Sequence, residues 1–207
     1  MRKIIVSLNI TLDGFIAGEE LELDWHFRYW NAELARYATE QLSRADTILL
    51  GRITFEAMQD YWPAKAVDTY YPREDISFAY MMNNYNKIVF SKTVSASTWH
   101  NTRFVKSGLK KEVQRLRMQV GKPIMVYGSC SIVSALMKYN LVDEYLLWVH
   151  PILLGRGRSL FNGTEREELL LKESQAFRSG VVVLSYAVTA HHFNTKKDIY
   201  GEVYFER

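Results

Sequence analysis

The stretch TILLGRITFEAMQ, residues 47–59, places an apolar run directly before helix-like spacing, with Gly51 and Arg52 at the junction. A short apolar run that ends in a glycine is typical of a buried strand, and the spacing from Ile53 to Tyr61 favours a helix. The glycine and the cation have two interpretations: a tight connection, or a seat for an anion at the first turn of the helix. For this junction alone, a tight connection is the commoner outcome.

The rest of the chain alternates short apolar strands with amphipathic helices. Asn31 is a suitable N-cap for the first helix, and Trp62-Pro63 is expected to end the second. Two apolar segments flank Arg178-Ser179-Gly180 and predict a closing hairpin. Strands are predicted at residues 3–10, 47–50, 87–90, 124–127, 145–149, 169–177 and 181–189, and helices at residues 31–43, 53–61, 75–83, 109–120 and 131–139.

This order of elements predicts the fold class. Strands that alternate with helices favour an α/β fold whose central sheet is parallel for much of its width, and the hairpin adds antiparallel strands at one edge. No Gly/Ser linker, internal repeat or low-complexity tract divides the chain. We therefore expect one domain over residues 1–190, followed by an extension of uncertain structure over residues 191–207.

Composition argues against several classes of function. The 207 residues carry a net charge of +3 with dispersed basic residues, which does not indicate nucleic-acid binding, and no apolar run approaches the length of a membrane span. The single cysteine, Cys130, cannot form an internal disulfide, and the five histidines show no metal-ligand spacing. We expect a cytoplasmic protein with a small-molecule substrate and no structural metal. The apolar residues of the hairpin and tail suggest a homodimer.

A second strand end repeats the arrangement of the first. In IMVYGSCSI, residues 124–132, an apolar strand meets a glycine and a helix follows within a few residues. Free N–H groups at a helix start form a phosphate site with nearby hydroxyl donors, and ligands gather at the carboxyl ends of strands in open α/β sheets. Cys130 is expected to pack there rather than to act as a nucleophile. The candidate cofactor residues of this junction are Tyr127, Gly128, Ser129, Cys130 and Ser131.

A third strand ends in Ser91 and Lys92. A lysine at a strand terminus can pair with a ribose phosphate, which would favour NADPH over NADH, although a lone lysine is more often a solvated charge. The chain has no G-x-G-x-x-G after a strand, no G-x-x-x-x-G-K-[ST] and no G-x-S-x-G. The chain therefore lacks the common sequence motif for each of three activities: dinucleotide binding, nucleotide hydrolysis and serine hydrolysis.

The chain contains, in order, LDGFIA, then LLGR-x-TFE, and then LVDEY followed by HP-x-LLG-x-G-x-x-LF. This order resembles the dihydrofolate reductase superfamily, and more closely the reductase domain of the bifunctional deaminase–reductase of riboflavin synthesis. The resemblance covers most of residues 1–188 and implies a three-layer fold with helices on both faces of the sheet. The deaminase signature, H-x-E with P-C-x-x-C, is absent from the chain.

The resemblance implies an NADPH-dependent reductase that transfers a hydride to a small heterocyclic or carbonyl substrate. Its family-level label is 5-amino-6-(5-phosphoribosylamino)uracil reductase, with dihydrofolate reductase and a non-catalytic NADPH-binding protein as the alternatives. By this likeness, the two glycine junctions would meet the phosphates, the third strand end the adenosine ribose, and the first strand and its loop the nicotinamide. The cofactor residues implied in this way are Asn9, Gly14, Ile16, Gly51, Arg52, Thr54, Ser91, Lys92, Gly128, Ser129 and Ser131.

Substrate and proton-donor residues are harder to assign. Asp13 lies beside the implied nicotinamide site and is the first candidate for proton delivery, while Asp-Gly is also a strong turn pair. Dihydrofolate reductases carry a buried carboxylate on the helix after the first loop. The corresponding stretch here, FRYWNAELARY, has a single acid, Glu33, which the helix dipole would also favour at a first turn. The residues that could wall a substrate cavity, or simply pack, are Trp25, His26, Trp30 and Trp62.

Overall fold

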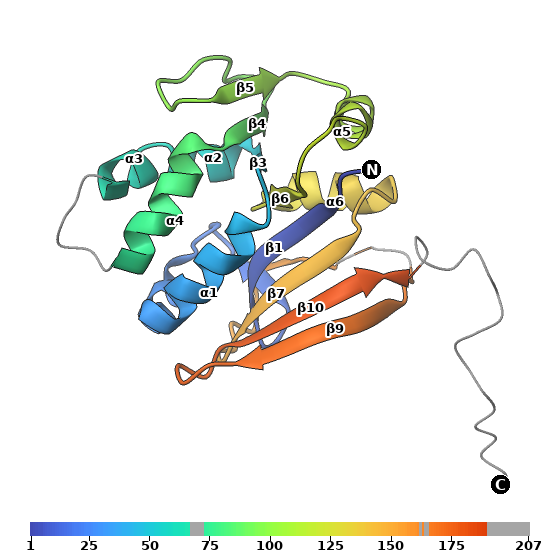
Figure 1. The fold of residues 1–207 in the computed structure, drawn as a ribbon. Helices are drawn as coiled ribbons and strands as arrows, with labels where there is room; N and C mark the ends of the chain where they lie inside the picture. Colours follow the sequence, from blue (N-terminus) through green and yellow to red (C-terminus); the bar gives the residue numbers. More distant parts are fainter. Residues whose placement is uncertain (67–72, 162, 164–165, 190–207) are drawn as a thin grey trace, which may run out of the picture.

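The computed structural model describes residues 1–66, 73–161, 163 and 166–189. Over these residues the chain forms an eight-stranded sheet in the order β5-β4-β3-β6-β1-β7-β10-β9 (Figure 1). A separate two-stranded sheet joins β2 (Phe15–Ala17) to β8 (Arg158–Ser159). The strands of the large sheet are β1 (Ile4–Thr11), β3 (Thr47–Gly51), β4 (Asn86–Phe90), β5 (Thr102–Val105), β6 (Ile124–Val126), β7 (Glu144–His150), β9 (Leu169–Ala176) and β10 (Val182–Val188).

Most neighbouring strands of the large sheet are parallel. β1 pairs in parallel with β6 and β7, β3 with β4 and β6, and β4 with β5. β10 is antiparallel to both β7 and β9. The predicted α/β class, with a mostly parallel sheet and an antiparallel hairpin near its C-terminal edge, is therefore confirmed. Because parallel strands point the same way, the carboxyl ends of β4, β3, β6 and β1 meet at one edge of the sheet.

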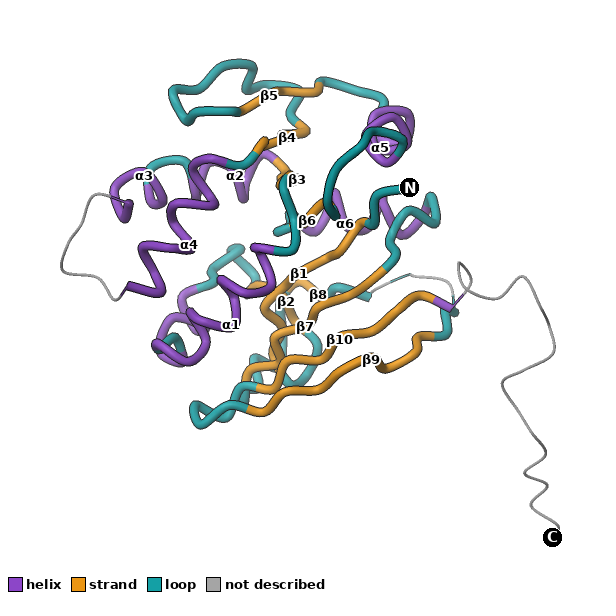
Figure 2. The backbone as a smooth tube through the Cα atoms, viewed as in Figure 1, coloured by secondary structure: helices purple, strands orange, loops and turns teal. Residues whose placement is uncertain are grey.

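Helices cover both faces of the sheet, which gives the three layers expected (Figure 2). Helices α1 (Ala32–Ser43) and α4 (Arg73–Asn84) contribute Leu34 and Phe78 to an apolar cluster on one face. Helices α5 (Leu109–Arg117) and α6 (Cys130–Lys138) contribute Val113 and Leu136 to a cluster on the other. Asn31 caps α1 as predicted, since its side chain accepts a hydrogen bond of 3.0 Å from the Leu34 N–H.

The helix predicted over residues 53–61 is wrong in its boundaries. The structure has α2 (Arg52–Met58) and then a new helix, α3 (Tyr61–Ala66). Pro63 lies in the first turn of α3, where a proline fits because the first N–H groups of a helix have no intrahelical partner. Trp62-Pro63 therefore begins a helix instead of ending one. Strand β5 and the 3-10 helix η1 (Asp24–Tyr29) are additional elements, each too short to show a period in sequence.

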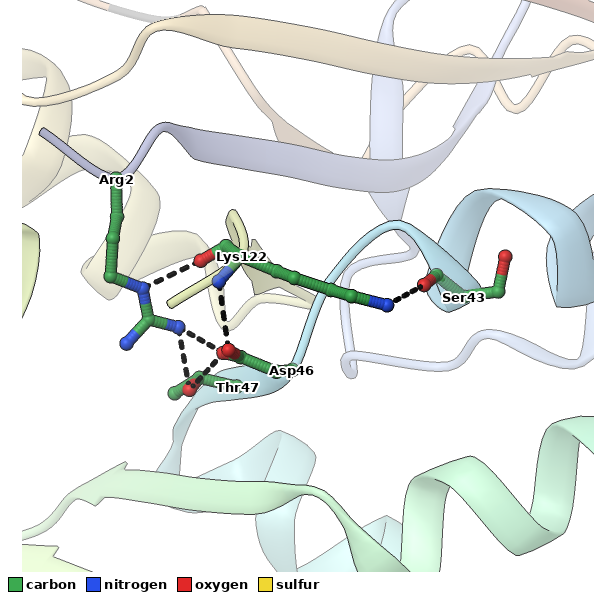
Figure 3. Close-up of polar contacts among 5 residues, drawn as sticks. All are labelled: Arg2, Ser43, Asp46, Thr47 and Lys122. Carbon is green, nitrogen blue, oxygen red and sulfur yellow. Dashed lines mark hydrogen bonds and ion pairs between the residues drawn. The ribbon is translucent and has the colours of Figure 1, made fainter. Parts of the chain in front are cut away.

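A polar network joins the amino ends of three neighbouring strands (Figure 3). Arg2, which is 7% exposed, precedes β1 and contacts Asp46 and Thr47 at the start of β3. Its Nε donates to the Lys122 carbonyl, before β6, at 2.6 Å, and the Lys122 N–H donates to Asp46 at 2.8 Å. The network lies at the sheet edge opposite the glycine junctions. It satisfies a buried guanidinium and needs no ligand to do so.

Strand β9 forms one edge of the sheet and exposes apolar side chains. Leu170 and Leu171 are each 50% exposed. The expected homodimer stays a prediction, and the extension predicted over residues 191–207 lies outside the described residues. In the part of the chain that the structure describes, no helix is long and apolar enough to cross a bilayer.

Candidate functional site

The two glycine junctions, 77 residues apart in sequence, touch one another. Strands β3 and β6 are neighbours, and the Gly51 N–H donates a hydrogen bond of 3.0 Å to the Gly128 carbonyl. A Cβ on Gly51 would lie 2.1 Å from the Ser129 Oγ and 3.0 Å from the Ser129 backbone nitrogen. Only a glycine allows this approach, so the structure supplies a reason for Gly51 that a simple turn does not.

The helices that follow these junctions begin without a capping side chain. In the described part of the chain, no side chain accepts a cap hydrogen bond at Gly51 before α2 or at Ser129 before α6, in contrast to Asn31 before α1. Their first N–H groups are therefore left for another acceptor. Hydroxyl groups surround the same point: the Oγ atoms of Ser129 and Ser131 lie 3.2 Å apart, and Thr54 Oγ1 faces Gly128. This arrangement fits a phosphate group.

Charged residues at the same edge have partners of their own. Arg52 forms an ion pair of 2.7 Å with Glu56, one turn further along α2, and both side chains are partly exposed. Strand β4 lies beside β3, which places Ser91 and Lys92 near this edge. The buried Ser91 hydroxyl accepts a hydrogen bond of 2.8 Å from the Val94 N–H, whereas Lys92 is exposed. Ser91 thus shapes the loop, and Lys92 is placed as a surface charge.

A cavity of about 150 Å³ opens on the α1 and α4 face of the sheet, beside the junctions. Three of the four predicted substrate residues line it, together with Asn9 and Tyr127 from the predicted cofactor set. Trp25 does not: it is 7% exposed and packs edge-on against His150 at 5.2 Å between ring centroids. The lining residues are Ser7, Asn9, His26, Phe27, Trp30, Ala38, Gln41, Met58, Tyr61, Trp62, Phe78, Tyr127 and Trp148.

The RibD C-terminal domain family matches residues 2–183. This chain belongs to that family. It is 34% identical over 186 residues to the Bacillus subtilis protein YyaP, covering 89% of this chain and 94% of YyaP.

Solved structures share the fold of this RibD C-terminal domain. A putative riboflavin biosynthesis protein from Shewanella sp. PV-4 superposes with a TM-score of 0.67 at 22% identity, over 90% of this chain and 98% of that one. A deaminase/5-amino-6-(5-phosphoribosylamino)uracil reductase from Thermotoga maritima gives a TM-score of 0.63 at 14% identity, over 90% of this chain and 56% of that one. The RibD C-terminal domain described here thus spans about half the length of the Thermotoga protein.

In this RibD C-terminal domain, Ser7 and Asn9 of β1 and Gln41 of α1 are polar residues that line the cavity. Trp148 Nε1 donates to Ser7 Oγ at 3.1 Å, and His150 Nε2 contacts Asn9 Oδ1 at 3.0 Å. The sequence patterns did not identify Gln41, which lies on the apolar face of α1. A polar residue within such an apolar stripe can indicate a functional position. Ser7 was missed too. Its alternation with Asn9 along an apolar strand is the pattern of one shared face.

The two acids considered as site residues in the sequence, Asp13 and Glu33, do not line the cavity. Glu33 accepts a hydrogen bond of 3.3 Å from the Arg178 N–H in the hairpin turn, outside the cavity lining. Asp13 is exposed and accepts hydrogen bonds from the Thr11 hydroxyl at 2.6 Å and the Gly155 N–H at 2.7 Å. Desolvation raises the pKa of Asp13, but these hydrogen bonds outweigh it and lower the pKa below its ordinary value. These contacts support the turn role of Asp13, and its catalytic role stays a prediction.

Three further predicted cofactor residues have structural roles. Gly14 has φ +87° and closes a turn in which its N–H donates to the Thr11 carbonyl at 3.0 Å. Ile16 is 8% exposed and belongs to the core. Cys130 packs against the same cluster, and burial raises the pKa of its thiol, which keeps it protonated at neutral pH. Ile16 and Cys130 thus support the site through packing.

The burial of His150 is expected to make the free energy of unfolding depend on pH. It is 3% exposed, and burial, with a smaller effect of His26, lowers its pKa from 6.5 to about 4. Between these values the unfolded chain binds a proton that the folded chain does not, so the free energy of unfolding falls as the pH falls. We expect a loss of about 2 kcal/mol by about pH 5 from this residue.

Urea unfolding at neutral pH and at about pH 5 checks this expectation. His150→Gln should lose distinctly less stability on acidification than the wild type. His100→Gln, at an exposed position, is the matched control and should behave as the wild type does. Equal losses in the wild type and His150→Gln would show that His150 is not the group that titrates.

Proposed function

We propose that this chain is an NADPH-dependent reductase that transfers a hydride to a small heterocyclic or carbonyl substrate held in the cavity. The contact between Gly51 and Gly128 carries the proposal, because it joins two uncapped helix starts into one anion seat. The cavity lies beside this anion site, since Tyr127, which immediately precedes Gly128, lines the cavity. When bound, NADPH supplies the hydride. The chain binds its phosphates, orients its ring and excludes water from the acceptor.

The phosphorylated aminouracil named for the Thermotoga relative is the first substrate to assay, because the family assignment points to it. Dihydrofolate is less well supported. Among the described residues, no carboxylate lines the cavity, and Glu33 is engaged elsewhere. A non-catalytic NADPH-binding protein is the alternative from a different class. Tight NADPH binding without hydride transfer to a broad substrate panel would support that alternative.

Titration of the purified protein with NADPH and with NADH tests the proposal directly. NADPH should bind with saturation and more tightly than NADH, because Lys92 at the β4 end favours the additional phosphate. Oxidation of NADPH in steady state is then followed with each candidate substrate. If neither nucleotide binds, the proposal is wrong at its centre.

Replacing Arg52 with alanine should weaken NADPH binding by about 1–3 kcal/mol, because a charge-assisted contact to a phosphate would be lost. The side chain must leave Glu56 to make this contact, which its partial exposure permits. Arg44→Ala is the matched control, since Arg44 forms a similarly exposed ion pair of 2.6 Å with Glu40, also one helical turn apart. Isothermal titration with NADPH measures both. Unchanged affinity in Arg52→Ala would remove Arg52 from the site.

A further inference from the structure

Reduction of a C=N or C=O bond consumes a proton as well as a hydride, so a group at the cavity must supply that proton. In the part of the chain that the structure describes, no aspartate, glutamate, lysine, arginine or cysteine lines the cavity. The lining side chains with a proton on an ionisable ring or hydroxyl group are Ser7, His26, Tyr61 and Tyr127. Of these side-chain types, only the imidazole ordinarily gains and loses a proton near neutral pH.

A hydrogen bond determines which nitrogen of His26 exchanges its proton. Nδ1 contacts the Leu23 carbonyl, and a carbonyl only accepts hydrogen bonds, so Nδ1 carries a hydrogen in both charge states of the ring. Nε2 has no hydrogen-bond partner among the described residues, and it is not one of their buried unpaired atoms, so it remains accessible. The ring therefore loses and regains its proton at Nε2.

The neighbours of His26 place its charge change in a range that suits proton transfer. Burial lowers the pKa of the ring from 6.5, while the Leu23 carbonyl and the charge of Asp24 act in the opposite direction. Titratable neighbours from other elements are His150 of β7, at 6.1 Å between ring centroids, and Tyr61 of α3, which lines the same cavity. His150 is uncharged at neutral pH, because burial lowers its pKa to about 4. An acid that ionises somewhat below neutral pH delivers a proton readily.

We propose that His26 is the general acid of this reductase, and that its protonated ring donates from Nε2 to the nitrogen or oxygen of the acceptor bond. The inference rests on the proposed function, because it adds the proton donor of the same reaction. The hydride from bound NADPH goes to the carbon of that bond. The Nε2–H bond breaks as the new N–H or O–H bond forms, the imidazolium becomes a neutral imidazole, and solvent returns a proton to Nε2. Asp13, the acid expected in this role from the sequence, does not line the cavity.

Nuclear magnetic resonance of nitrogen-labelled histidine tests the state of the ring without any ligand. At neutral pH and above, His26 should show a protonated Nδ1 and a bare Nε2, and it should titrate at a lower pH than His100, which is exposed. The spectrum of His26→Asn assigns the signals. A neutral ring protonated at Nε2 would overturn the proposal, because Nε2 would then not be the atom that exchanges its proton.

The pH dependence of kcat/KM for NADPH oxidation tests the role in turnover, with the phosphorylated aminouracil as the acceptor. For the wild type, kcat/KM should fall about ten-fold per pH unit between about pH 7 and 9, because only the protonated ring donates. His26→Asn keeps a donor for the Leu23 carbonyl but has no atom in place of Nε2. It should lower kcat/KM about 100-fold at neutral pH and make the profile flat. His100→Gln is the control and should keep the wild-type profile.

Added imidazole distinguishes proton donation from a structural effect. It should restore part of the activity of His26→Ala, and more at neutral pH than at about pH 9, since only its protonated form donates. No restoration, with the folded protein still binding NADPH, would assign His26 a packing role and overturn the proposal.

Two further outcomes would reject the proton donor and leave the cofactor site standing, provided that NADPH binds. One is a pH profile that persists in His26→Asn and disappears in Asp13→Asn. The other is no turnover of the aminouracil at any pH. Failure of NADPH to bind the wild type would instead reject the reductase itself.

Discussion

Replacing Lys87 with methionine is expected to lower the free energy of unfolding by about 3–5 kcal/mol. Lys87 is fully buried at the start of β4, and its Nζ donates to the carbonyls of Met82, Asn83 and Tyr85 at 2.9–3.0 Å. These carbonyls lie at and just beyond the end of α4, where helix carbonyls lack intrahelical partners. The ammonium also lies 4.6 Å from the centroid of the Trp99 ring.

The lysine replaces water as the partner of this helix end. Burial lowers the pKa of Lys87 to about 8, so the group is still mostly protonated at neutral pH and keeps its three donors. Methionine fills much of the same space, which confines the loss to the charge and the hydrogen bonds. The carbonyls would then be buried and unpaired.

Urea unfolding at neutral pH measures the effect. Lys111→Met, at an exposed position on α5, is the matched control and should change the free energy of unfolding by less than about 0.5 kcal/mol. A similarly small effect for Lys87→Met would mean that the helix end finds other partners.

Gly51→Ala is expected to reduce NADPH affinity by about 100-fold, or close to 3 kcal/mol. The added Cβ would meet both the hydroxyl and the backbone nitrogen of Ser129. The hydroxyl can rotate away, but the backbone nitrogen moves only with the first turn of α6. The two helix starts would therefore separate, and a phosphate would lose donors from one of them.

A second glycine distinguishes this effect from a general loss of stability. Gly108 has φ +76° with open space around it, so Gly108→Ala strains the backbone before α5 without touching the junctions. It should lower stability and leave NADPH affinity unchanged. NADPH affinity within two-fold of the wild type in Gly51→Ala would contradict the shared anion seat.

The junctions show how far sequence alone reaches into the site. An apolar run, a glycine and helical spacing predict a strand-to-helix connection at residues 47–59 and again at residues 124–132, and both connections exist. Their contact could not be predicted from these patterns, because strand order depends on pairing between distant segments. β3 and β6 became neighbours through the tertiary fold. That pairing, rather than either glycine by itself, turns two ordinary connections into one candidate seat.

The residues that line the cavity could be predicted from the sequence only in part. Aromatic side chains suggest a wall wherever they occur, and His26, Trp30 and Trp62 do line the cavity while Trp25 packs beneath His150. The polar residue of α1 that lines the cavity is Gln41, not the acid Glu33. Which turn of a helix faces a cavity depends on how the helix sits on the sheet, and a short sequence window does not contain that information.

The sequence by itself determined the α/β class, the helix cap at Asn31 and the position of each glycine junction, because local spacing and capping chemistry are properties of adjacent residues. Only the tertiary structure decided that Gly51 meets Gly128 and that Gln41 faces the cavity. It also decided that the ammonium of Lys87 binds the carbonyls at the C-terminal end of α4. These contacts join residues whose relation is set by the packing of whole elements. The junction in TILLGRITFEAMQ, which alone predicts a tight connection, therefore becomes half of a candidate binding site because strand β6 lies beside it.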